Sequence, residues 1–128
     1  MDLRKLRPDF RYSEPMATVT CEEVEELLPL LADHDPTTRA ETVRALCPCH
    51  VKSYDDRIWN RLFEMVDDAD LNVRRQVFHA LGDGSPRELE GQVVAAFEVF
   101  TQDADAKLKR RARKLMASYR RTGKVNVL

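Results

Sequence analysis

The chain has 128 residues, of which 43% are hydrophobic and 34% are charged, a composition typical of a folded, soluble protein rather than a disordered one. No apolar run approaches the roughly 20 residues of a membrane-spanning helix, and the charged N-terminus lacks the apolar stretch of a secretory signal. The three cysteines are too few, and odd in number, for a disulfide framework, so we expect a reduced, cytoplasmic protein.

Charge is distributed unevenly along the chain, although the net charge is only −1. Residues 22–70 contain 13 acidic and 5 basic residues (−8), whereas residues 103–128 contain 9 basic and 2 acidic residues (+7). This asymmetry predicts electrostatic association, either with a partner or between the acidic half of one copy and the basic end of another. The nearly neutral total argues against a dedicated nucleic-acid-binding protein.

Helix-start signals divide the chain into an arm, three helix pairs and a tail. We expect the arm to be extended, with Phe10 and Tyr12 either covering the first helix or contacting a partner. The expected units are an arm over residues 1–19, helix pairs over residues 20–52, 53–84 and 85–122, and a tail over residues 123–128.

The first helix of each pair, here called the A helix, begins at a capping pattern. Thr20 and Glu23 form a capping box, which predicts a helix from Glu22 to about Ala32. Pro29 lies inside this helix and should kink it. The second and third A helices are predicted to open at Ser53 with Asp56, and at Ser85–Pro86–Arg87–Glu88.

The second helix of each pair, the B helix, begins at an aspartate, and these aspartates recur every 35 residues at Asp35, Asp70 and Asp105. Apolar positions follow each of them at helical spacing. A basic residue stands one turn after each of these aspartates, and we expect it to pair with this N-terminal aspartate, either of its own or of an adjacent repeat. These basic residues are Arg39, Arg74 and Lys109.

This repeated pattern resembles the HEAT-repeat family, in particular short bacterial HEAT-like proteins with bilin-lyase-type repeats. The resemblance rests on the Asp-x-x-(Val/Leu)-(Arg/Lys) start of the B helices and on the ending Ala80–Leu81–Gly82. It implies an all-α fold, a right-handed α–α superhelix whose B helices line a concave groove. Such arrays serve many purposes, so the motif predicts architecture far better than activity.

We expect the groove to bind an acidic segment of a partner protein, with Val43 and Phe78 supplying apolar contact and basic side chains fixing the register. The alternative for Phe78 is a place in the core. The predicted partner-binding residues are Val43, Arg44, Arg75, Phe78, His79, Arg110, Arg113 and Lys114.

The basic run from Lys107 to Lys114 leaves other interpretations open. One interpretation is that the last B helix, with no following repeat to cover it, needs these cations only to stay solvated. Phosphate contacts would make the run a nucleic-acid site with strong salt dependence. An accessory protein resembling bilin lyases is a further alternative.

We found no pattern that indicates catalysis and expect neither an enzyme nor a cofactor. The three histidines are scattered, and no glycine-rich phosphate loop occurs. Cys47, Cys49 and His50 are weak candidates for metal ligands, because zinc prefers four ligands and no second cysteine pair exists. A buried Cys47 at a helix end is the interpretation that we favour.

Overall fold

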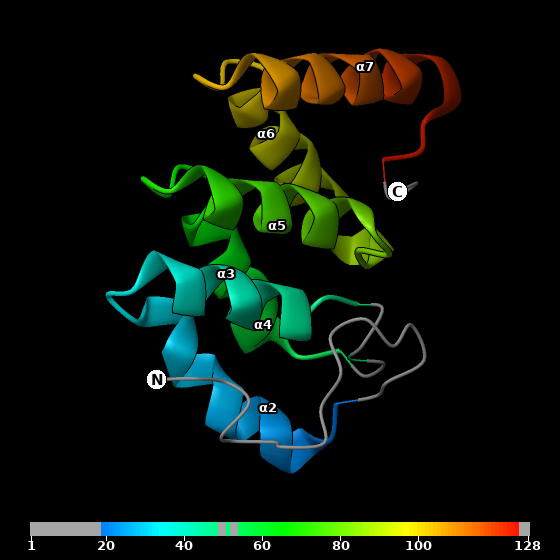
Figure 1. Ribbon diagram of the computed structural model, residues 1–128. Coiled ribbons are helices and arrows are strands. Elements are labelled where there is room, and N and C mark those ends of the chain that lie inside the picture. Colours follow the sequence, from blue (N-terminus) through cyan, green and yellow to red (C-terminus); the bar gives the residue numbers. More distant parts are fainter. Residues whose placement is uncertain (1–18, 49–50, 52–53, 126–128) are drawn as a thin grey trace.

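The structure is a computed structural model that describes residues 19–48, 51 and 54–125, and over these ranges the chain is helical without strands (Figure 1). The elements are α2 (Cys21–Leu27), the 3-10 helix η1 (Leu28–Ala32), α3 (Pro36–Ala45), α4 (Asp56–Glu64), α5 (Leu71–Gly82), the 3-10 helix η2 (Arg87–Leu89), α6 (Glu90–Phe100) and α7 (Ala106–Thr122). The expected arm, with Phe10 and Tyr12, lies outside the described residues except for Val19, as does the tail after Val125.

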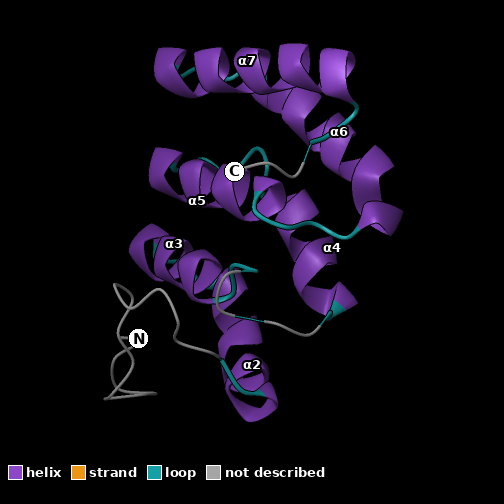
Figure 2. Ribbon diagram, turned by 90° about the vertical axis from the view of Figure 1, so that its right-hand side faces the viewer, coloured by secondary structure: helices purple, strands orange, loops and turns teal. Residues whose placement is uncertain are grey.

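The helices are arranged in two layers (Figures 1 and 2). The B helices α3, α5 and α7 lie one above another in one layer, and the A helices α2, α4 and α6 form the other. α3 packs against α5, and α6 contacts both α5 and α7, so each pair rests on the next. This arrangement confirms the prediction of an all-α, α–α solenoid. None of the described helices is long and apolar enough to cross a membrane.

The B helices begin at the predicted aspartates. The side chain of Asp35 accepts a hydrogen bond from the Thr37 amide at 3.0 Å. Asp70 and Asp105 accept from the amides three residues later, at 3.0 Å and 2.9 Å. Each bond satisfies an amide that has no partner within its helix, which is why an aspartate at this position starts a helix.

The A helices follow the prediction less closely. The capping box of Thr20 and Glu23 is present, but α2 ends at Leu27, and Pro29 lies in the 3-10 helix that follows. A proline cannot donate the α-helical hydrogen bond, so the helix changes its winding there. α4 is capped by Asp55 rather than Ser53, which lies outside the described residues. The third A helix starts with the short η2, and α6 begins only at Glu90.

An arginine–aspartate ladder joins successive repeats. Nε and Nη2 of Arg39 donate to the two carboxylate oxygens of Asp68, both at 3.1 Å. Arg74 repeats this with Asp103, at 2.9 Å and 3.2 Å. The acceptor belongs to the next repeat and stands two residues before its N-cap, so it is not the N-cap aspartate that the sequence predicted. Lys109, at the third ladder position, forms no ion pair with a described residue.

The ladder holds Asp68 in its ionised form. Burial raises the pKa of Asp68, but the hydrogen bonds from Arg39 and from the Asp70 amide outweigh it, and the pKa lies below its usual value. Arg74 Nη1 in turn donates to the backbone carbonyl of Asp68 at 2.8 Å. Asp68 therefore connects the arginine of the preceding repeat to the arginine of its own repeat.

Val43 and Phe78 do not face a groove; both are buried, at 0% and 1% exposure. The Phe78 ring packs edge to face on Phe97 and Phe100 in α6, with centroids 5.0 Å and 5.4 Å apart. Val43 and Phe78 occupy the same position of successive B helices, on the side that faces the following repeat. A repeat that is followed by another therefore needs an apolar side chain at this position. Arg113 occupies the equivalent position in α7, where no described repeat follows, and it is exposed.

Candidate functional site

Most of the remaining predicted partner-binding residues lie on the solvent-facing side of the B helices. Helical spacing of three or four residues places them on one face of each helix, and the repeat brings the three faces into line. We call this surface the B-helix strip. Its exposed basic members are Arg44 in α3, Arg75 and His79 in α5, and Lys107, Arg110, Arg111 and Lys114 in α7.

The strip is most strongly charged on α7. Eight of the 17 residues of this helix are Lys or Arg, and none is acidic. Lys107 and Arg111 were not among the predicted partner-binding residues, although both share a face with Arg110 and Lys114. Their spacing of four residues was the signal that could have identified them.

Side chains below the strip hold parts of it in place. The guanidinium carbon of Arg111 lies 5.1 Å from the centroid of the Phe78 ring, a distance suited to a cation–π contact. Arg75 Nη2 lies 3.9 Å from a carboxylate oxygen of Asp105, the N-cap of α7. Phe78 thus supports the strip from the core, although it is not part of the exposed surface.

A shallow polar depression interrupts the strip between α3 and α5. It has a volume of about 230 Å³ and is open to solvent. Six of its seven lining residues have hydrogen-bonding side chains, and two of these, Glu41 and Asp70, are acidic. The residues that line it are Thr37, Ala40, Glu41, Arg44, Asp70, Asn72 and Gln76.

Arg113 belongs to a different surface from the rest of the predicted set. Its Nε donates to the backbone carbonyl of Thr101 at 3.2 Å, across the turn that joins α6 to α7. It lies on the side of α7 that would face a further repeat, together with Lys109 and Ala117. The structure therefore separates Arg113 from Arg110 and Lys114.

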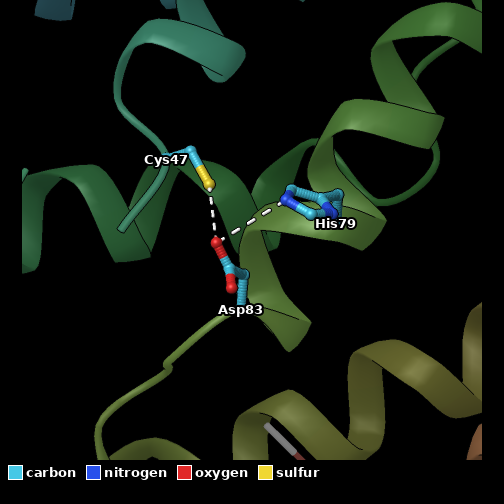
Figure 3. A group of neighbouring side chains, drawn as sticks. All are labelled: Cys47, His79 and Asp83. Atoms are coloured by element: carbon cyan, nitrogen blue, oxygen red, sulfur yellow. Dashed lines mark hydrogen bonds and ion pairs between the residues drawn. The ribbon is translucent and has the colours of Figure 1, made fainter. Parts of the chain in front are cut away.

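Three side chains with metal-ligating atoms meet where α3 and α5 end (Figure 3). Cys47 Sγ donates to Asp83 Oδ2 at 3.4 Å, and His79 Nε2 lies 3.6 Å from the same oxygen. All three ligand atoms lie within 4.8 Å of one another. We call this group the Cys47 cluster.

The Cys47 cluster differs from the metal set predicted from the sequence. Cys47 is buried, as expected, while Cys49 and His50 lie outside the described residues. The sequence did not point to Asp83 or to a partnership of Cys47 with His79, since they are 36 and 32 residues away, roughly one repeat. The Asp83 carboxylate lies next to both the Cys47 thiol and the His79 imidazole and is a partner of each.

Comparison with known proteins agrees with this architecture. A family model described as HEAT repeats matches residues 24–117. No curated protein and no solved structure gives a significant match. HEAT repeats are generally protein-interaction scaffolds and are typically non-enzymatic. With the family model covering most of the chain, the two-layered stack and its aspartate-capped B helices identify this protein as a member of the HEAT-repeat family.

Proposed function

We propose that this chain is a non-enzymatic interaction module that binds an acidic segment of a partner protein along its B-helix strip. The observation that carries the proposal is the basic face of α7, formed by Lys107, Arg110, Arg111 and Lys114. None of these four forms an ion pair with a described residue.

The need to keep the last helix solvated does not explain why its solvent-facing side has four basic residues. The equivalent solvent-facing positions of α3 and α5 contain one and two Lys, Arg or His residues respectively, and the rest are neutral or acidic. These positions are Thr37, Ala40, Glu41 and Arg44 in α3, and Asn72, Arg75, Gln76 and His79 in α5. Helices with the same outward face thus stay solvated without four cations. The excess charge on α7 repels itself until an anionic partner neutralises it.

The rest of the molecule favours a protein partner over nucleic acid. The exposed side of α2 carries Glu22, Glu25 and Glu26, and the net charge is −1. These carboxylates repel a long phosphate backbone but leave a short acidic peptide free to lie on α7. The polar depression between α3 and α5 adds hydrogen-bonding groups that a peptide backbone can use.

Fluorescence anisotropy tests the proposal with two labelled probes, a short Glu-rich peptide and a random-sequence DNA duplex, each at two salt concentrations. We expect the peptide to bind, and the double variant Arg110→Glu/Lys114→Glu to lose at least tenfold in affinity, consistent with charge pairs at an interface. Arg87→Glu is the control for the single variant Arg110→Glu, which changes the net charge by the same amount, since Arg87 is exposed and outside the strip. It should bind like the unmodified chain.

Three outcomes would contradict the proposal. Tighter binding of DNA than of the peptide would assign the basic face to nucleic acid. An equal effect of Arg87→Glu would mean that only net charge matters. The third outcome is that the unmodified chain self-associates in sedimentation, the double variant does not, and the monomer binds no peptide. The partner of the basic face would then be a second copy of this chain.

A further inference from the structure

The Cys47 cluster shares His79 with the B-helix strip, but it rests on a separate observation, the side-chain chemistry where the ends of α3 and α5 meet (Figure 3). We propose that Cys47, His79 and Asp83 form a binding site for a transition-metal ion of the zinc class. A thiolate, an imidazole and a carboxylate are the three ligand types that zinc takes from proteins.

The distances are close to those of an occupied site. Zinc bonds of about 2.0–2.3 Å at tetrahedral angles place neighbouring ligand atoms roughly 3.3–3.6 Å apart. The sulfur and nitrogen atoms lie 3.4 Å and 3.6 Å from Asp83 Oδ2. The ligand atoms of all three residues, including those of Cys47 and His79, lie within 4.8 Å of one another.

Charge and exposure also suit a metal ion. On binding, the Cys47 thiol releases its proton to solvent, and thiolate and carboxylate together balance the two positive charges of the ion. Cys47 is buried, whereas the side chains of His79 and Asp83 are 49% and 25% exposed. The cluster therefore opens to solvent on one side, from which the ion enters and a water molecule supplies the fourth ligand.

The fold holds these ligands in place from two repeats. Cys47 follows α3, which packs along α5, and α5 carries His79 and ends next to Asp83. A bound ion would connect the first repeat to the second on the side opposite the ladder pair at the helix starts. We therefore expect the metal to stabilise the contact between α3 and α5.

Titration of Co(II) into the reduced full chain tests the site. A cobalt–thiolate bond produces a charge-transfer absorption in the near ultraviolet, and we expect one equivalent to bind and Zn(II) to displace it. Cys47→Ser should abolish the band, and His79→Gln and Asp83→Asn should each weaken binding by roughly tenfold or more, since each removes one of three protein ligands. Cys21→Ser and His34→Gln are matched controls at exposed positions outside the cluster.

Thermal unfolding with Zn(II) or with a chelator gives a second readout. Metal that binds only the folded chain raises its melting temperature, and the three cluster variants should lose this rise. Absence of a thiolate band, or binding that survives both His79→Gln and Asp83→Asn, overturns the proposal. If Cys47→Ser fails to fold, His79→Gln and Asp83→Asn, which change part-exposed side chains, still show whether the cluster binds the metal. Loss of binding in Cys49→Ser and His50→Gln, with His79→Gln unaffected, would assign the metal to residues 47–50 instead.

Discussion

Replacing Phe78 with alanine measures how strongly the second repeat is packed onto the third. The ring is 1% exposed, so the substitution removes a fully buried aromatic side chain, a change that typically costs about 3–5 kcal/mol. The variant also loses edge-to-face contacts with Phe97 and Phe100 at 5.0 Å and 5.4 Å, and such pairs contribute about 0.5–1.5 kcal/mol each. We therefore expect a loss near the upper end, about 5 kcal/mol.

Urea denaturation followed by far-ultraviolet circular dichroism measures this loss. Small domains have about 5–15 kcal/mol of total stability, so the unfolding midpoint of Phe78→Ala should fall sharply. Val99→Ala is the control: Val99 is 48% exposed, and we expect a change within about 0.5 kcal/mol. An unfolding midpoint for Phe78→Ala equal to that of the unmodified chain would refute the packing argument and return Phe78 to the surface.

Three further predictions concern the ladder and the end of α7. Arg74→Ala leaves the 6% exposed carboxylate of Asp103 without its cation and should cost about 3 kcal/mol in urea denaturation. Removal of the exposed Arg57 should cost much less, and an equal loss in both variants would contradict the role of burial. Because the pKa of Asp68 is lowered in the folded state, its contribution to stability is present above about pH 3.9 and disappears as the pH falls through the folded pKa. Acid titration of Asp68→Asn should therefore show a smaller loss of stability; an unchanged acid profile would contradict the role of the ladder. Gly123 has a φ of 72°, so alanine there should cost about 1 kcal/mol through strain alone, measured by thermal unfolding, and no loss would mean that the end of α7 unwinds freely.

The position shared by Val43, Phe78 and Arg113 shows where sequence reasoning failed. Helical periodicity identified the stripe that packs against the A helix, and it left this position on the polar side. In a solenoid each inner helix also has a second buried stripe against the following repeat, and periodicity within one helix does not report it. The change from apolar residues in two repeats to arginine in the last was the available signal.

The sequence by itself determined the 35-residue period, the aspartates that start the B helices and the capping box at Thr20. The caps are local features, since each depends on hydrogen bonds within a few residues of the chain, and the period is a pattern that is visible in the sequence alone.

Only the tertiary structure decided which side chains are exposed and which distant residues meet. Stacking buried Phe78, brought Arg39 to Asp68, and placed Cys47 beside His79 and Asp83. All of these contacts join different helices or the turns beside them, and those of Arg39 and Cys47 reach Asp68 and Asp83, 29 and 36 residues away. Their geometry follows from how the helices pack rather than from the spacing of residues along the chain.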